Sequence, residues 1–266
     1  LLIQAARDEF LVMVLDRVGE CMLASDNGEK IEGALKDSPY TFKPREDRMA
    51  AFNAQVTHTL ALKPSAYFND VNAYFSGETA IDNWQSLGLQ GFADFAARID
   101  NDKTLSLIAI LPLLPVPPFI MLTTFLENVD VDLSVVEIFC ERVHNELQED
   151  HPNIGHIAAC LRAVSNSSAT GLVLQMVTQV LSHPCSQNIE LLATISGRLW
   201  RTLEREELCH LFVEQLANND AGQAAFSQLL ADLMFMPNMR AHVMTALRST
   251  NRSDELSKAV GEMFEG

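Results

Sequence analysis

The sequence predicts an all-α protein, an irregular multi-helix array of about 12 to 14 helices. Apolar residues recur at the three- and four-residue spacing of amphipathic helices along most of the 266 residues. No stretch alternates apolar and polar residues as a half-buried strand does. A pair of helical segments recurs three times between Asn153 and Phe264, which predicts stacked helix-hairpin, HEAT-like repeats in the C-terminal half.

Five segments in the first hundred residues have helical patterns, one of them weak. Residues 1–24 carry an apolar stripe, and a weaker signal over residues 29–45 predicts a short helix and a loop. The stripe of the first segment consists of Ile3, Phe10, Val14 and Val18. A helix over Glu46–Leu62 has Met49, Phe52, Val56 and Leu60 on one side. Helices over Ala66–Phe75 and from Leu89 to Ile99 follow, and Asp100, Asn101 and Asp102 form a polar turn.

An uncharged stretch of 23 residues, Thr104–Leu126, is long enough to cross a bilayer. It contains Pro112, Pro115, Pro117 and Pro118, each of which removes a backbone donor. We therefore predict two short buried helices, Leu105–Leu111 and Phe119–Leu126, joined by a proline-stiffened connector. We expect no membrane contact.

The second half begins with a helix from Ser134 to about Gln148, for which Ser134 and Glu137 form a capping-box pattern. Asp130 and Asp132 precede this helix, where aspartate favours capping over cation binding. The three pairs that follow are Asn153–Asn166 with Ala169–His183, Gln187–Arg201 with Arg205–Asn218, and Gln223–Phe235 with Met239–Ser249. They fit a true solenoid or an irregular stack equally well.

These patterns divide the chain into three regions: an N-terminal helical region (1–102), a proline-containing connector (103–152) and a repeat region (153–266). One continuous domain is the alternative. The first half shows no comparable period.

The charge is strongly acidic, with 35 Asp and Glu against 19 Lys and Arg, a net charge of −16. Nucleic acids and anionic membranes both require clustered positive charge, so we expect neither as a partner. The five cysteines are odd in number and widely spaced, which predicts reduced thiols in a cytoplasmic protein.

Two segments carry a resemblance to a known family. The sequence over Gln4–Leu11 reads QAARDEFL, and that over Trp84–Asp94 reads WQSLGLQGFAD. Both resemble an uncharacterised bacterial family, catalogued as a domain of unknown function. The resemblance implies a bacterial cytosolic origin and places Leu1 inside a longer protein whose N-terminal part is absent. It assigns no catalytic or binding residue.

Two Glu-x-x-His pairs have the spacing of di-iron helix bundles, Glu141 with His144 and Glu207 with His210. Such ligands must point inward, whereas the apolar stripes of both helices place these side chains on the polar side. We therefore predict no metal site. No phosphate-binding loop, nucleophile elbow or HExxH motif occurs, so we expect no cofactor and assign no catalytic residue.

Positive charge in the repeat region is concentrated at Arg198, Arg201 and Arg205, with Trp200 beside them. Arginine pairs bidentately with carboxylates and phosphates, so these four residues are the candidate partner-binding site. The alternatives are an intramolecular network of the arginines with Glu204, Glu206 and Glu207, or simply a solvated face.

The predicted function is that of a non-catalytic helical-repeat protein or scaffold that binds a macromolecular partner, a protein. The alternative is an enzyme whose active site lies in a cleft between the N-terminal and repeat halves. A deep cavity with converging catalytic groups would favour the enzyme, and a broad groove would favour binding.

Overall fold

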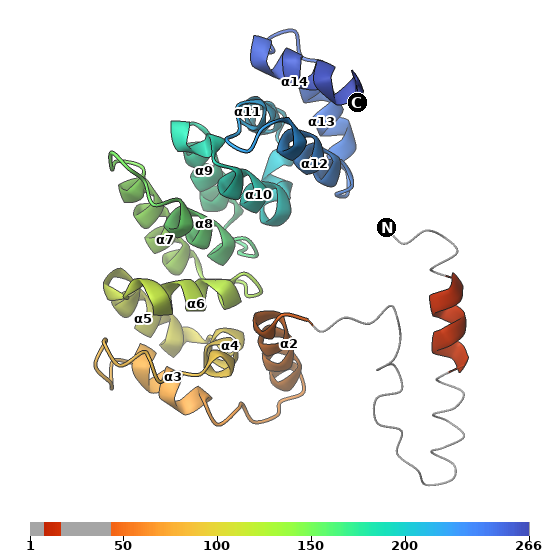
Figure 1. Ribbon diagram of the computed structural model, residues 1–266. Coiled ribbons are helices and arrows are strands. Elements are labelled where there is room, and N and C mark those ends of the chain that lie inside the picture. Colours follow the sequence, from red (N-terminus) through yellow and green to blue (C-terminus); the bar gives the residue numbers. More distant parts are fainter. Residues whose placement is uncertain (1–7, 17–43, 266) are drawn as a thin grey trace. The chain divides into compact units, whose positions relative to one another are not determined.

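The computed structural model describes residues 8–16 and 44–265 and divides the chain into two compact units, 1–46 and 47–266. In the first unit residues 8–16 are helical, with Phe10 and Val14 half-buried. The expected ends of that helix and the elements predicted over residues 17–43 lie outside the described residues. Throughout the described ranges the regular structure is helical, with no strand, so the predicted all-α class is confirmed (Figure 1).

The second unit contains thirteen α-helices in its described part, of which the first, α2, begins one residue before the unit boundary. Their bounds are α2 Glu46–Thr59, α3 Phe68–Phe75, α4 Leu89–Ala97, α5 Asn101–Ile110, α6 Val116–Leu126, α7 Leu133–Glu146, α8 Ile154–Ala163, α9 Thr170–Leu181, α10 Ile189–Arg198, α11 Glu206–Ala217, α12 Gln223–Met234, α13 Met239–Leu247 and α14 Asp254–Glu265. Three short 3₁₀ segments join them, η1 Leu111–Leu113, η2 Pro184–Gln187 and η3 Trp200–Glu204.

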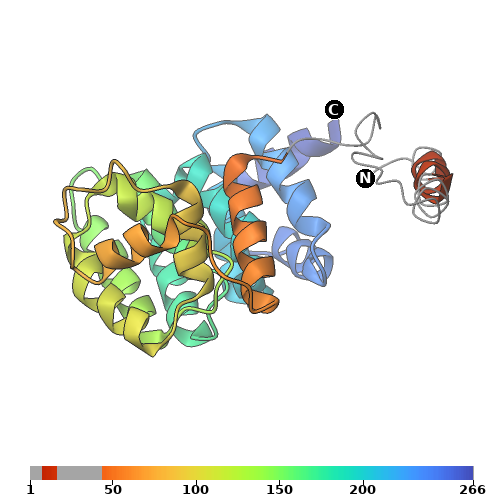
Figure 2. The same cartoon turned by 90° about the horizontal axis from the view of Figure 1, so that it is seen from below.

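The helices from α3 onward form two rows. In one row α4, α6, α8, α10 and α12 contact one another in that order, and in the other α3, α5, α7, α9, α11 and α13 do the same. Figures 1 and 2 show the helices following one another in sequence order from α3 to α14. The three predicted pairs correspond to α8 with α9, α10 with α11, and α12 with α13. The rows therefore start well before the first pair that is visible in the sequence.

The core lies between the rows and is filled by the expected apolar stripes. On α7, Val136 and Val143 are buried while Glu141 and His144 are exposed. On α11, Leu208 and Phe212 are buried while Glu207 is exposed. Burial of each such apolar side chain contributes roughly 1.5–3 kcal/mol, so packing between rows holds helices that are individually short.

The uncharged stretch forms most of α5, then η1 and α6, which confirms two short helices in place of a span. The polar turn predicted over Asp100, Asn101 and Asp102 is wrong, because Asp100 caps α5 and the other two residues belong to its first turn. Pro117 and Pro118 lie in the first turn of α6, not in the connector. The first residues of a helix have no intrahelical acceptor for their N–H groups, so proline is tolerated there. None of the described helices is long and apolar enough to cross a bilayer.

The sequence places the apolar residues of α2 correctly on one side, but that side is not the one that packs. Met49 is 41% and Phe52 69% exposed, whereas Ala50 and Ala54 are buried. The Gln90 amide also donates to the Ala50 carbonyl oxygen at 3.2 Å. Small residues such as Ala50 and Ala54 let the backbone of α2 approach its neighbour closely.

Aspartates cap α5 and α7. Asp100 accepts from the backbone N–H of Lys103, and Asp132 accepts from that of Ser134. The predicted capping role of Asp132 is confirmed, whereas the capping box that starts at Ser134 lies two residues too late. Hydrogen bonds from Lys103 lower the pKa of Asp100, and hydrogen bonds from Ser134 lower the pKa of Asp132.

Four of the five cysteines lie in the described residues, and all four are free thiols: Cys140, Cys160, Cys185 and Cys209. Cys160 and Cys209 are buried, and this burial raises the pKa of each thiol to about 12. The prediction of reduced thiols holds for these four residues, and Cys21 lies outside the described part.

Gly91 marks the closest approach of α4 to the start of α3. A Cβ atom there would lie 2.5 Å from the Tyr67 carbonyl oxygen and 2.7 Å from a methyl carbon of Val71. The backbone oxygen cannot rotate away, so the helices would have to separate. We expect Gly91→Ala to lower the free energy of unfolding by about 1–3 kcal/mol, measured by denaturant titration.

The matched control is Gly261→Ala in α14, where a Cβ would meet nothing within 4 Å. An exposed helical glycine is less favourable than alanine, so this change should stabilise the chain by about 0.5–1 kcal/mol. Equal effects at the two glycines would contradict the close approach at Gly91.

Candidate partner-binding pocket

A pocket of about 500 Å³ opens along the edge of the array where α6, α8 and α10 end and α9 and α11 begin. Its walls come from residues 165–174 and 197–205, together with Glu127 at the end of α6. All four residues of the predicted partner-binding site, Arg198, Trp200, Arg201 and Arg205, line it.

The turn between α10 and α11 positions these four side chains. Arg198 is the last residue of α10, η3 starts at Trp200, and Arg205 occupies the N-cap position of α11 without a side-chain capping bond. Leu199 and Leu203 in the same turn are buried, and they anchor it to the core. The two buried leucines therefore hold a turn from which all three arginines line the pocket.

Glu127 is the acidic residue of this pocket, and its side chain is only 3% exposed. One carboxylate oxygen pairs with Arg48 of α2, and the other lies 3.5 Å from Nε of Arg198. A buried carboxylate requires positively charged partners. The ion pair with Glu127 therefore restrains the side chain of Arg198. Sequence reasoning missed Glu127 and Arg48, which are 79 residues apart; the one local signal was a charge directly after the uncharged stretch.

Arg201 and Arg205 have no carboxylate partner within 4.0 Å among the residues that the structure describes. The expected network with Glu204, Glu206 and Glu207 is not formed, and these glutamates are exposed. The guanidinium of Arg201 lies 5.4 Å from the centre of the Trp200 ring, a cation–π contact. Within the described residues, two of the three arginines therefore have no carboxylate partner.

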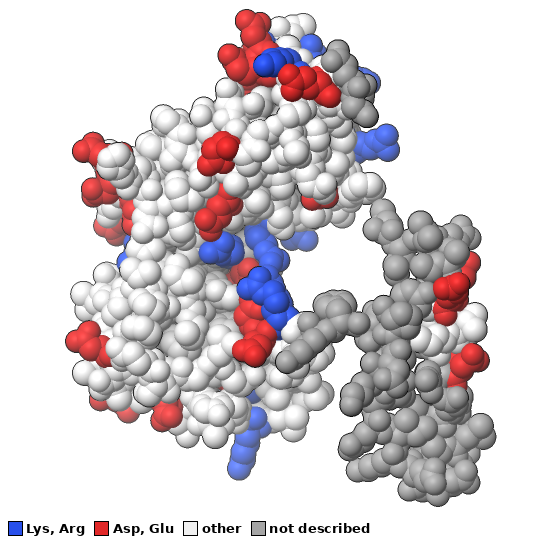
Figure 3. Space-filling view, in the orientation of Figure 1, with Lys and Arg blue, Asp and Glu red and all other residues white. Residues whose placement is uncertain are grey.

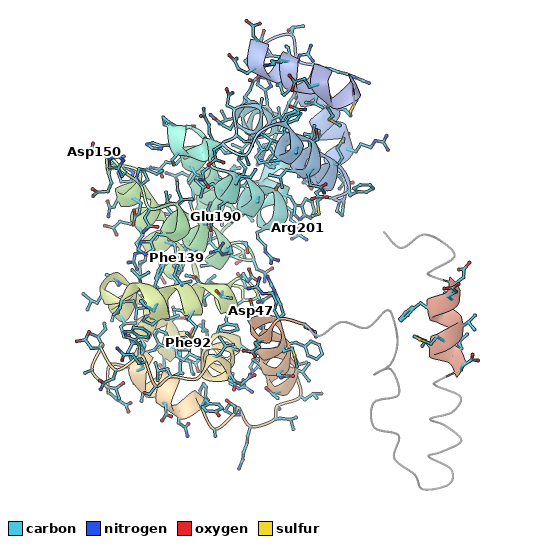
Figure 4. The ribbon with its side chains drawn as sticks, in the orientation of Figure 1. Asp47, Phe92, Phe139, Asp150, Glu190 and Arg201 are labelled. Atoms are coloured by element: carbon cyan, nitrogen blue, oxygen red, sulfur yellow. The ribbon has the colours of Figure 1, made fainter. Side chains whose placement is uncertain are left out.

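Figure 3 shows Lys and Arg side chains gathered near the middle of this face, with acidic side chains beside them. Figure 4, in the same orientation, labels Arg201 in that region, on the side of the array on which Asp47 lies. The protein as a whole is acidic, so the pocket edge is a local positive site.

The opposite wall is the start of α9. Ala169 stands at its N-cap and provides no side-chain hydrogen bond, while Thr170 and Gly171 line the pocket. The preceding loop is held by Ser167, which donates to the Val131 carbonyl oxygen at 2.8 Å, and by Asp130, which accepts from the Ser168 N–H at 2.7 Å. The positive end of the α9 dipole adds to the arginine charge at this pocket.

The Glu-x-x-His pairs do not come together. His144 contacts Gln179 across 2.6 Å, and His210 lies 3.7 Å from Glu214. In the described ranges no group of three His, Cys, Asp or Glu side chains is placed to hold a metal ion.

The fold and the pocket define a class: a two-row helical protein with an arginine-lined pocket at one edge. The chain belongs to a family of proteins of unknown function, DUF3549, whose family model matches residues 1–264. Comparison with curated proteins and with solved structures found no match.

Proposed function

We propose that this chain is a non-catalytic, HEAT-like helical-repeat scaffold that binds an acidic segment of a protein partner at the arginine-lined pocket. The observation that carries the proposal is the pair of exposed guanidinium groups, Arg201 and Arg205, that line a pocket without carboxylate partners in the described structure. Binding an anion there would satisfy charge that the fold leaves unmatched.

The architecture supports a scaffold role. Each helix of a row contacts the helix two positions along, as in stacked helix pairs, and such stacks present long edges with many side chains. The pocket lies at the helix ends and not in a row interior, so an extended segment could reach it. We also propose a cytoplasmic location, which the free thiols among the described cysteines and the strongly acidic charge support.

The composition of the pocket favours binding over catalysis. A hydroxyl nucleophile needs an adjacent base. No histidine lines this pocket, and three of its hydroxyls donate to backbone carbonyl oxygens instead. These bonds are Ser165 to Arg162 at 2.8 Å, Ser167 to Val131 at 2.8 Å, and Thr202 to Leu199 at 2.7 Å.

The test is capture of partners from the native cell with a charge-reversed pocket. We expect the variant R201E/R205E to lose the partner that the unchanged chain retains, at least tenfold by quantitative mass spectrometry. Arg198 is left unchanged because a glutamate there would face the buried carboxylate of Glu127. The matched control is R240E/R248E, which makes the same change in net charge at two exposed arginines outside the pocket.

A second variant tests the pocket without changing charge. A Cβ at Gly197 would meet nothing within 4 Å, and Gly197 lines the pocket, so Gly197→Leu places a side chain in its open space. It should reduce capture as R201E/R205E does, with an unchanged far-UV circular dichroism spectrum. Equal capture by the unchanged chain, R201E/R205E and Gly197→Leu would remove the pocket from the function.

A further inference from the structure

We infer that the acidic group received by this pocket is a phosphomonoester, carried by the partner as a phosphorylated side chain. This inference rests on the proposed function and specifies its ligand. Arg201 and Arg205 are the groups assigned to the phosphate oxygens.

The number and state of the arginines point to phosphate. Arg198 uses Nε toward Glu127, while Arg201 and Arg205 have no ion pair in the described part of the chain. A single carboxylate is satisfied by one bidentate guanidinium. A phosphate dianion has three terminal oxygens and about twice the charge, and it is matched by two or more guanidinium groups.

The wall opposite the arginines also suits this group. The first turn of the twelve-residue helix α9 lines the pocket, and its N-cap residue Ala169 offers no side-chain hydrogen bond, while Ser167 Oγ accepts from the Ala169 N–H at 3.2 Å. Phosphates are commonly bound where backbone N–H groups at a helix N-terminus and arginine side chains meet. Gly171 in this turn has open space around its missing Cβ, so a ligand atom can approach the backbone.

The charges that face the pocket leave a net attraction for an anion. The lining contains four charged groups, Glu127, Arg198, Arg201 and Arg205, and the charge of Glu127 is matched by Arg48 and Arg198. The lining residues from the α8–α9 connection and α9 carry no ionisable side chain. Because no histidine lines the pocket, a change in affinity near pH 6 reports on the ligand.

The experiment compares peptide pools of random sequence that carry one fixed central phosphoserine, glutamate or serine. Fluorescence anisotropy with the full chain is expected to give a dissociation constant at least tenfold lower for the phosphoserine pool than for the glutamate pool. R201Q/R205Q should abolish this preference, whereas the control R240Q/R248Q should keep it. R201K/R205K should weaken it, because lysine keeps the charge but loses bidentate geometry.

A second readout is pH. The second pKa of a phosphomonoester is about 6, so lowering the pH from 7.5 to 5.5 should weaken phosphoserine binding roughly fourfold as the dianion is protonated. Any binding of the glutamate pool should stay unchanged, because its carboxylate remains ionised over that range.

The outcomes separate this inference from the proposed function. Equal affinity for the glutamate and phosphoserine pools would overturn the phosphate assignment and leave acidic-segment binding intact. Competition by inorganic phosphate or by a free nucleoside monophosphate as strong as that by the phosphoserine pool would overturn the peptide source. Failure of the proposed function appears independently, as partner capture that R201E/R205E does not change.

Discussion

Substitution of Asp94 by alanine is expected to lower the free energy of unfolding by about 3–5 kcal/mol. Asp94 lies in the middle of α4 and is 1% exposed. Its carboxylate accepts from the Ser65 N–H at 2.9 Å and from a guanidinium nitrogen of Arg98 at 3.0 Å. Removing it leaves a largely buried guanidinium and a backbone donor without their acceptor, and unfolding in urea would measure the loss.

The role of Arg98 makes a double-mutant cycle informative. Its guanidinium also donates to the Thr57 hydroxyl at 3.0 Å and lies 3.4 Å from the Leu62 carbonyl oxygen, so it ties the end of α4 to the last turn of α2 and to the chain after it. Asp94→Ala combined with Arg98→Met removes both charges, and it should cost less than the sum of the single changes by more than 0.5 kcal/mol. A cost below about 1 kcal/mol for Asp94→Ala alone would refute the buried pair as a stabilising contact.

Substitution of Phe75 by alanine should also cost about 3–5 kcal/mol. Phe75 ends α3 and is 1% exposed. Its ring centre lies 4.6 Å from that of Phe95 in a stacked arrangement, and 5.6 Å from that of Phe92 in an edge-on one. Deleting the ring opens a cavity between α3 and α4 and removes both aromatic contacts.

The matched control is Phe235→Ala at the end of α12, where the side chain is 73% exposed. The same truncation there should change stability by no more than about 0.5 kcal/mol. A similar loss at both positions would mean that the cluster of Phe75, Phe92 and Phe95 adds nothing specific to packing.

Part of the candidate site was readable from local spacing. Arg198, Arg201 and Arg205 recur at near-helical spacing across the end of one predicted helix and the start of the next, so their proximity follows from sequence alone. The predicted helix Gln187–Arg201 was too long, because α10 ends at Arg198 and η3 follows over Trp200–Glu204. The sequence did not show which carboxylates, if any, pair with these arginines. Glu204, Glu206 and Glu207 are closer in sequence, yet Arg198 pairs with Glu127, which lies 71 residues away and is buried. Ion pairing depends on distance in space, and the fold alone brings α6 to the end of α10.

For α2, too, the sequence predicted the helix but not the side of it that packs. The pattern of Met49, Phe52 and Val56 predicted a helix with one apolar side, and the helix is present. The structure instead buries Ala50 and Ala54, which the pattern did not single out. The periodicity of apolar residues shows that a helix has an apolar side and a polar side. Which side packs on a neighbouring helix also depends on how closely the two backbones can approach.

The amino-acid sequence by itself determined the helical class, the three C-terminal helix pairs and the local cluster of arginines, because helical periodicity, capping and charge spacing act over fewer than about twenty residues. The tertiary structure decided that the rows begin at α3, that Glu127 is held by Arg48 and Arg198, and that the start of α9 closes the pocket opposite Arg201 and Arg205. These are meetings of distant segments, and short-range patterns in the chain carry no information about which segments meet.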